Sequence, residues 1–274
     1  MRPAEPDLPL RHALALGLLQ GPAELLPISS SAHTTLLPWL AAWPYAELDG
    51  ERRKSFEVAL HAGAGLALAL HLRRELTRAA EEMSARSAGL LAVALAPAAI
   101  VGLALGPTIE RRLGGPGSIA AGLAAGAVAM ALADTHPGPG VRAWPDATVL
   151  DALALGLAQA AALMPGVSRS GATLTAARAR GFERGDAQAL SWTVALPVIL
   201  GASALKGLRL ARGGLADESV AGPALGAGAA FVSTLASAHL IGPRRRPQQS
   251  LLPFAIYRLA VAGVTGNRLR SRPG

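Results

Sequence analysis

Long apolar runs, separated by short charged stretches, constrain this chain more than any other feature of its sequence. Each run approaches the roughly 20 apolar residues that a helix needs to cross a bilayer. The runs cover approximately residues 56–72, 88–106, 117–133, 187–210, 221–241 and 251–266. Because 51% of all residues are hydrophobic and only 16% are charged, we predict an all-α integral membrane protein with six transmembrane helices.

Two further apolar segments, residues 12–28 and 149–180, contain breaks that are unsuited to a simple crossing. Pro22 and Pro27 are expected to break the first, and a Gly/Ser-rich stretch breaks the second. Irregular backbone at membrane depth needs protein or a water-filled cavity around it, so each segment is expected to form a re-entrant helical hairpin. The first segment also resembles a secretory signal in composition, but a second copy of it deep in the chain favours a place in the mature fold.

An internal repeat relates these two segments. A shift of 139 positions lays residues 13–18 on residues 152–157 without a mismatch. The halves cover about residues 8–133 and 149–266, and a Pro/Gly-rich linker at 134–148 joins them within a single polytopic domain. A hairpin returns to its own side of the membrane and three crossings do not, so the halves are expected to be inverted-topology repeats, as in many transporters.

The charge distribution restricts the possible partners. The net charge of +8 comes from arginines between the apolar runs and near the C-terminus, as expected of loops that face anionic lipid headgroups. With 4% aromatic residues and no reading motif, a nucleic-acid partner is not expected. The chain has no cysteine, which excludes a disulfide framework and a cysteine nucleophile. Lys and Arg divide almost evenly between the two sets of loops, so charge does not fix the orientation.

A polar stretch interrupts the second hairpin at residues 165–173, which read Pro-Gly-Val-Ser-Arg-Ser-Gly-Ala-Thr. Arg169 supplies a guanidinium fork suited to a phosphate group, and Ser168, Ser170 and Thr173 supply hydroxyl groups beside it. Ionisable residues at membrane depth are rare and usually functional, so we interpret this stretch as an anion-binding site. The alternative is an interfacial loop whose arginine reaches up to water.

The first hairpin carries the groups for proton transfer and nucleophilic attack. Gln20 and Glu24 are four residues apart and so share a helical face, and Ser29, Ser30 and His33 follow Pro27. Together with Arg169 they are expected to form a midplane pocket for phosphoryl transfer, with a divalent cation on Glu24.

Each of these residues also has a purely structural interpretation. Glu24 would form an ion pair with Arg169, Gln20 would be hydrogen-bonded inside the bundle, and His33 would be a hydrogen-bonded spacer. One of the three serines at 29–31 is expected to cap a helix. His61 and Glu57 are further intramembrane ionisable residues that the sequence does not place in the pocket.

Residues 16–33, 165–173 and 253–258 together resemble the undecaprenyl-diphosphate phosphatases of the BacA/UppP type. The resemblance extends over nearly the whole chain, and the middle stretch differs from the common family form only at Val167. It implies an enzyme that hydrolyses undecaprenyl diphosphate to undecaprenyl phosphate and inorganic phosphate, which recycles the lipid carrier for cell-wall synthesis and confers bacitracin resistance. It also implies a multi-pass protein of the bacterial cytoplasmic membrane, an active site open to the periplasmic face and a divalent cation, Mg²⁺ or Ca²⁺. A homodimer is left open.

The resemblance also distributes roles among the residues. Together, the residue pattern and the resemblance predict catalytic roles for Glu24, Ser30, His33 and Arg169, with Glu24 also binding the metal, and substrate-binding roles for Gln20, Ser29, Ser168, Ser170 and Thr173. The chain departs from the family pattern at Gln20, where glutamate is common, at Ser31-Ala32, where Thr-Gly is usual, and at His61, where glutamine is common. The acidic motif of the family falls on Gln20 and Glu24, so it has only one carboxylate here. Glu24 is therefore expected to contribute more to metal binding than it would beside a second glutamate.

Two other classes of protein remain as alternatives. A secondary transporter or lipid flippase would also use inverted repeats around a midplane pocket, and release of phosphate would distinguish the two. A phosphatase of the PAP2 type requires a histidine soon after its Ser-Arg pair. Here the next histidine after Ser168-Arg169 is His239, so this class ranks last.

Overall fold

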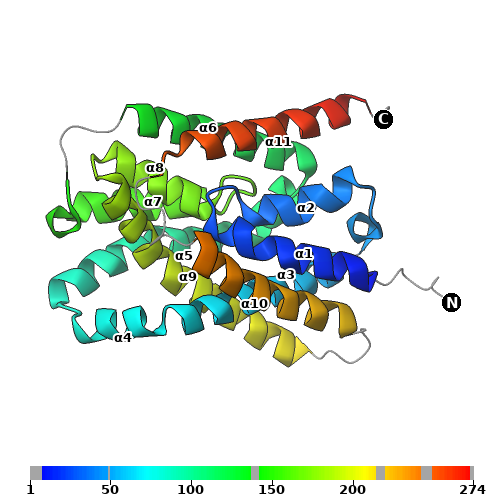
Figure 1. Ribbon diagram of the computed structural model, residues 1–274, viewed down its shortest axis with the longest axis horizontal. Helices are drawn as coiled ribbons and strands as arrows, with labels where there is room; N and C mark the ends of the chain where they lie inside the picture. Colours follow the sequence, from blue (N-terminus) through cyan, green and yellow to red (C-terminus); the bar gives the residue numbers. More distant parts are fainter. Residues whose placement is uncertain (1–7, 49, 137–141, 214–219, 242–248, 272–274) are drawn as a thin grey trace. The chain divides into compact units, whose positions relative to one another are not determined.

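A computed structural model describes residues 8–48, 50–136, 142–213, 220–241 and 249–271. Within these residues the elements are all helices, and no β-strand is present (Figure 1). The helices of the first half are α1 (Leu10–Leu25), α2 (Ser30–Leu40), α3 (Gly50–His71), α4 (Arg73–Glu81), α5 (Ala85–Leu113) and α6 (Pro116–Thr135). Those of the second half are α7 (Val149–Ala161), α8 (Arg169–Ala179), α9 (Arg184–Gly213), α10 (Ala221–Ile241) and α11 (Leu252–Arg270). Short 3-10 helices occur at Pro44–Glu47 and Trp144–Asp146. Residues 137–141 of the predicted linker lie outside the described residues.

Three of the described helices are long and apolar enough to cross a membrane, namely α5, α6 and α10. A fourth candidate is the pair α3 and α4, which bends by 66° at Leu72. The all-α prediction and the helical character of the six apolar runs are therefore confirmed. Length and composition alone support three or four of the six predicted crossings.

The chain divides into two compact units. Unit 1 contains Met1–Leu25, His33–Thr77 and Pro197–Gly242, and unit 2 contains Leu26–Ala32, Arg78–Leu196 and Pro243–Gly274. Each unit thus combines segments from both halves of the sequence. The boundary between the units passes through the first hairpin.

In unit 1, α10 packs against both α1 and α3 (Figure 1). The contact is close because glycines face the backbone of α10: a Cβ atom at Gly17, Gly21 or Gly63 would collide with it. Small residues that let helix backbones approach are characteristic of packing in membranes, where dispersion contacts replace the hydrophobic effect. This contact fixes α1, which carries Gln20 and Glu24.

The prediction that Pro22 breaks the first segment is wrong, because α1 continues through Pro22 to Leu25. A proline inside a helix leaves the carbonyl four residues earlier without its usual donor. Here that carbonyl belongs to Leu18, and it accepts a hydrogen bond from the Ser233 hydroxyl on α10. A neighbouring helix therefore satisfies the backbone group that Pro22 frees.

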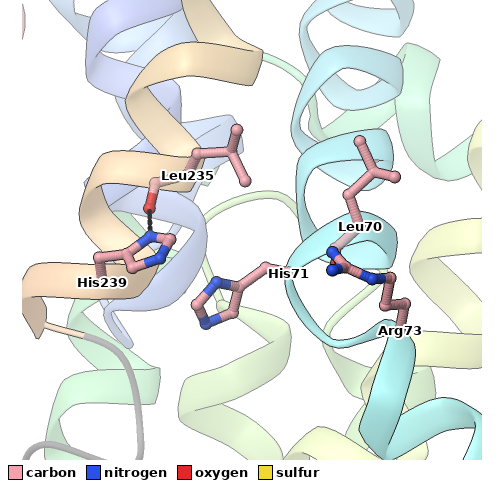
Figure 2. Close-up of a pocket in the computed structure, with 5 residues that line it drawn as sticks. All are labelled: Leu70, His71, Arg73, Leu235 and His239. Atoms are coloured by element: carbon pink, nitrogen blue, oxygen red, sulfur yellow. Dashed lines mark hydrogen bonds between the residues drawn. The ribbon is translucent and has the colours of Figure 1, made fainter.

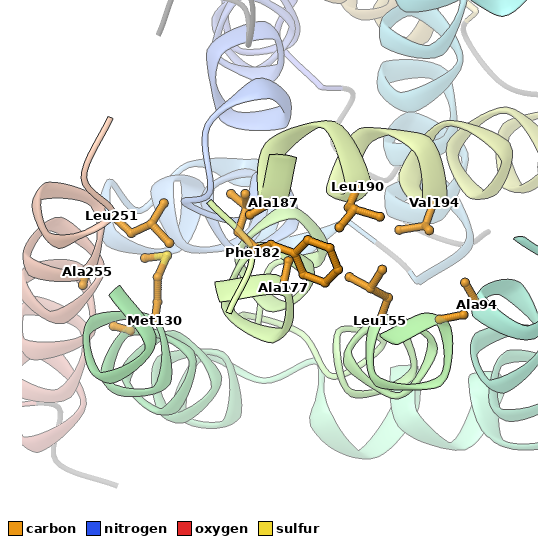
Figure 3. Packing of buried hydrophobic residues seen from close by; sticks show 13 residues of the cluster. Ala94, Met130, Leu155, Ala177, Phe182, Ala187, Leu190, Val194, Leu251 and Ala255 are labelled. Carbon is orange, nitrogen blue, oxygen red and sulfur yellow. The ribbon is translucent and has the colours of Figure 1, made fainter. Parts of the chain in front are cut away.

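In unit 2, α6 lies beside α11 and α8, and α7 packs against α5 and α8 (Figure 1). Buried apolar side chains from these helices and from α9 form one continuous core, in which the fully buried Phe182 lies near Leu155 and Leu190 (Figure 3). This core holds the second hairpin, α7 and α8, in place.

Two buried carboxylates connect the ends of the unit 2 helices. Asp151 lies in the first turn of α7 and accepts hydrogen bonds from Arg142 at 2.6 and 2.9 Å and from Arg180 at 2.6 Å. Asp134, near the end of α6, accepts hydrogen bonds from Arg184 at 2.9 Å and from the Leu251 amide at 2.9 Å. Because a buried charge is costly unless it is paired, these contacts fix where the helix ends meet.

A cavity of about 400 Å³ in unit 1 lies beside the bend between α3 and α4. Leu70, His71, Arg73, Leu235 and His239 line it (Figure 2). The rings of His71 and His239 stand edge to face with centroids 4.7 Å apart, and His239 Nδ1 is 2.8 Å from the Leu235 carbonyl oxygen. The cavity contains none of the predicted site residues.

Candidate active site

Each hairpin has a break between its two helices: the first break lies between α1 and α2, and the second between α7 and α8. The two breaks share one local geometry. Ser29 and Ser168, which are 139 positions apart, have left-handed backbone angles with φ of 77° and 68°. Each lies immediately before a helix, and its hydroxyl accepts a hydrogen bond from an amide three residues later, Ala32 at 3.4 Å or Gly171 at 3.2 Å. The expectation that one of the serines at 29–31 caps a helix is therefore confirmed for Ser29.

The serine hydroxyls pair in the same way in both breaks. The Ser29 and Ser31 oxygens are 3.4 Å apart, and the Ser168 and Ser170 oxygens are 3.3 Å apart. Left-handed backbone in a residue other than glycine costs free energy, on the order of 1–3 kcal/mol, and such residues cluster at functional sites. Its occurrence at both equivalent positions supports the internal repeat read from the sequence.

This geometry places a reactive side chain at each helix start. Ser30 is the first residue of α2, and Arg169 is the first residue of α8. The first amide groups of a helix have no acceptor within the helix, and the helix dipole adds positive potential there, so a helix start favours a phosphate group. Ser30 would add a hydroxyl nucleophile at one start and Arg169 a guanidinium at the other.

Arg258 of α11 joins the two breaks. Its side chain is completely buried, and it donates to the carbonyl oxygens of Gly166 at 3.0 Å, Val167 at 2.8 Å and Pro27 at 3.5 Å. Glycines make room for its guanidinium, because a Cβ atom at Gly126 or Gly171 would collide with it. Sequence reasoning assigned no role to Arg258, although an arginine within an apolar run was a signal that could have found it.

The second break also packs tightly on α6. Gly166 has φ of 94°, and a Cβ atom there would collide with the Ile119 carbonyl. A Cβ atom at Gly122 would likewise collide with the Pro165 carbonyl. The Ser170 hydroxyl lies 3.5 Å from the Leu26 carbonyl oxygen in the other break. The second break is thus held by α6, and the two breaks are joined by Arg258 and by the contact of Ser170 with Leu26.

We expect Arg258→Lys to lower turnover about 10- to 100-fold and stability by about 1–3 kcal/mol, because one ammonium cannot reach three carbonyls that a planar fork bridges. Thermal unfolding and phosphate release of the purified variant would measure both effects. Arg268→Lys, on the exposed surface of the same helix, is the matched control and should change neither. Unchanged turnover in Arg258→Lys would contradict this positioning role.

Thr173 differs in its surroundings from the other predicted substrate-binding residues. It is completely buried on α8, and its hydroxyl lies 2.9 Å from the Arg169 carbonyl oxygen and 2.6 Å from the Ser191 hydroxyl on α9. These contacts orient the first turn of α8, on which Arg169 lies. A direct contact between Thr173 and substrate stays a prediction.

In unit 1, Gln20 and Glu24 meet His61. Gln20 is completely buried on α1, and its Nε2 atom lies 3.2 Å from Glu24 Oε2 and 3.2 Å from His61 Nδ1 on α3. His61 Nδ1 is 3.7 Å from Glu24 Oε2. The structure thus places His61 beside the acidic motif, whereas Glu57 accepts a hydrogen bond from Tyr45 at 3.3 Å.

Gln20, Glu24 and His61, which we call the Gln20 cluster, carry ligand atoms suited to a divalent cation. Gln20 Oε1 is buried and has no hydrogen-bond partner, and a carboxylate and an imidazole lie beside the same side chain. Among the residues that the structure describes, no three His, Cys, Asp or Glu residues come together as a metal site. The amide oxygen of Gln20 is therefore needed to complete a three-ligand set.

The structure therefore arranges the predicted residues in two groups. Unit 2 brings together the two hairpin breaks, with Ser29, Ser30, Ser168, Arg169 and Ser170. Unit 1 brings together Gln20 and Glu24 with His61, and it also contains the buried His33, which follows Ser30 by one turn of α2.

Comparison with known proteins gives consistent matches along the chain. A family described as bacitracin resistance protein BacA matches residues 13–264. An undecaprenyl-diphosphatase of Geobacter metallireducens is 39% identical over 266 residues, which cover 92% of this chain and 96% of that protein. Those of Geobacter sulfurreducens and Pelobacter propionicus are 39% and 37% identical, and each match covers 93% of this chain and at least 95% of the relative.

Proposed function

Because the chain belongs to the bacitracin resistance protein BacA family, we propose that it hydrolyses undecaprenyl diphosphate to undecaprenyl phosphate and inorganic phosphate. The observation that carries this proposal is the pair of serine-capped helix starts with Ser30 on one and Arg169 on the other. One break thus offers a nucleophile and the other a phosphate ligand. Recycling of the lipid carrier for peptidoglycan synthesis and bacitracin resistance follow from this reaction.

The diphosphate binds to unit 2 in this proposal. Arg169 donates two hydrogen bonds to phosphate oxygens, and the first amides of α2 and α8 add further donors. Ser168 and Ser29 keep these helix starts in position through their caps, and Ser170 adds a hydroxyl group. Arg258 holds the two breaks together without touching the substrate.

Ser30 attacks the terminal phosphorus atom. Its hydroxyl oxygen forms a bond to phosphorus, the bond from phosphorus to the bridging oxygen breaks, and undecaprenyl phosphate leaves with that oxygen. His33, one turn further along α2, accepts the hydroxyl proton. Water then attacks the phosphoserine, inorganic phosphate leaves and Ser30 regains its proton.

Glu24 and Gln20 would hold a divalent cation, Mg²⁺ or Ca²⁺ by family resemblance, which would supply positive charge to this part of unit 1. The buried amide oxygen of Gln20 and the neighbouring carboxylate fit that role.

We place this reaction in the bacterial cytoplasmic membrane, on a protein with six crossings and two re-entrant hairpins as inverted repeats, open to the periplasmic face. The equivalent geometry at Ser29 and Ser168 supports the repeat. The chain is naturally free of cysteine, so single cysteines at Arg11 and Leu150, which are 139 positions apart, report sidedness without background. Labelling by an impermeant reagent from opposite faces is expected, and labelling of both from one face would overturn the inversion.

Phosphate release by the purified full-length protein in detergent tests the activity. With undecaprenyl diphosphate as substrate, we expect catalytic release of inorganic phosphate that a chelator suppresses and added Mg²⁺ restores. Binding of the lipid without phosphate release would contradict the hydrolase and favour a transporter or flippase. Micelles have no second compartment, so transport alone cannot produce the expected signal.

A further inference from the structure

Three side-chain tips from α1 and α3 form a small triangle in unit 1. Its edges are the 3.2 Å from Gln20 Nε2 to Glu24 Oε2, the 3.2 Å from Gln20 Nε2 to His61 Nδ1, and the 3.7 Å from His61 Nδ1 to Glu24 Oε2. Gln20 is completely buried and Glu24 nearly so, whereas the His61 side chain is 31% exposed. The cluster is therefore buried on the side of α1 and accessible at His61.

The triangle contains one anomaly, because both of its hydrogen bonds to Gln20 use Nε2 while Oε1 of the same carboxamide is buried without a partner. Buried acceptors without a partner are uncommon and usually have a reason. A half-turn of the carboxamide exchanges its oxygen and nitrogen with almost no change in shape. With the neutral His61 tautomer that carries its proton on Nε2, the three tips would then all be acceptors, and a cation among them could be bonded by all three.

The size of the triangle suits such a cation. A divalent cation that holds its ligands at roughly 2.0–2.3 Å has neighbouring ligand atoms about 2.8–3.8 Å apart in octahedral or tetrahedral coordination. All three edges fall within this interval. One imidazole nitrogen and two oxygens would hold such a cation, and water would supply the other ligands.

The imidazole determines which cation this cluster prefers. Mg²⁺ and Ca²⁺ favour oxygen ligands, whereas imidazole nitrogen favours transition metals and zinc. We propose that His61 is a ligand of the cation held by Gln20 and Glu24, and that it shifts the preference of this site from Mg²⁺ and Ca²⁺ toward first-row transition metals such as Mn²⁺. What the cation does rests on the proposed function, but whether His61 binds it does not.

Pulsed electron paramagnetic resonance of bound Mn²⁺ tests the ligand directly. The full-length protein in detergent is freed of metal, loaded with one equivalent of Mn²⁺ and measured for coupling to a histidine ¹⁴N nucleus. We expect this coupling in the wild type and its loss in His61→Gln. The matched control His12→Gln, on the same helix as Gln20 but stacked on Trp43, should retain it.

Two further measurements test the His61 ligand and the metal preference separately. Labelling the wild type with ¹⁵N-histidine should replace the ¹⁴N coupling by a ¹⁵N coupling, which requires no variant to fold. His61→Gln should weaken Mn²⁺ binding about 10- to 100-fold and leave Mg²⁺ binding nearly unchanged, so the ratio of the Mn²⁺ to the Mg²⁺ dissociation constant should rise by about the same factor.

Persistence of the ¹⁴N coupling in His61→Gln, or its absence from the wild type, would overturn the proposal. An unchanged ratio of Mn²⁺ to Mg²⁺ affinity would overturn the claimed preference. None of these readouts requires turnover. A protein that releases phosphate without histidine coupling would therefore refute the ligand alone, and one with the coupling but no phosphate release would refute the proposed function alone.

Discussion

Arg169→Ala is expected to lower turnover of undecaprenyl diphosphate at least about 1,000-fold while the protein stays folded. Arginines that stabilise a transferring phosphoryl group contribute factors of about 10³–10⁵ to rate. The alanine variant loses both the charge and the two-pronged hydrogen bond at the start of α8. The Ser168 cap and the Thr173 contact with Ser191 remain, so the local fold should persist.

Initial rates of phosphate release and a thermal unfolding curve would measure this prediction. Arg169→Lys should recover little activity, because a single ammonium does not reproduce the planar fork. Arg111→Ala removes an exposed arginine of α5 and controls for the loss of positive charge from the protein as a whole. Near-normal turnover in Arg169→Ala would remove the phosphate-binding role from this residue.

Ser30→Ala is expected to lower turnover on the order of 1,000-fold or more and to leave binding of the lipid diphosphate within a few-fold of wild type. The variant loses only the attacking oxygen, whereas Arg169 and both helix starts remain. Phosphate release and equilibrium binding would be measured on the same preparation. Loss of chemistry with retained affinity separates a nucleophile from a binding group.

Two neighbouring serines provide the controls for Ser30→Ala. Ser31 is exposed, so Ser31→Ala should retain most activity. Ser29 caps α2, so Ser29→Ala should lower stability by about 0.5–2 kcal/mol, an effect that Ser30→Ala should not share. Full turnover by Ser30→Ala would exclude the serine nucleophile and leave an activated water molecule as the attacking group.

The helices were predictable because hydrophobic runs and the 139-residue repeat are local or pairwise features of the sequence. The run at 221–241 coincides with α10, and the second broken segment, 149–180, contains α7 and α8. Pro22 was misread because its effect depends on a residue more than 200 positions away. Only the packing of α10 on α1 shows that Ser233 satisfies the Leu18 carbonyl.

The candidate site was predictable to the extent that its residues lie within motifs. Arg169, Ser168 and Ser30 were found because polar residues stand out within apolar segments. The cap role of Ser168 was not, since its left-handed backbone is visible only in three dimensions. His61 and Arg258 act through contacts with distant segments, and no local pattern could assign His61 to the Gln20 cluster or Arg258 to the two breaks.

In the proposed reaction, the chain transfers the terminal phosphoryl group of a lipid diphosphate to water. The fate of the oxygen atoms can be followed by hydrolysis of undecaprenyl diphosphate with the purified protein in ¹⁸O-enriched water and mass spectrometry of both products. Attack at the terminal phosphorus atom, by Ser30 and then water or by water alone, predicts one ¹⁸O atom in inorganic phosphate and none in undecaprenyl phosphate. Label in undecaprenyl phosphate, release of pyrophosphate, or unchanged lipid diphosphate would contradict it.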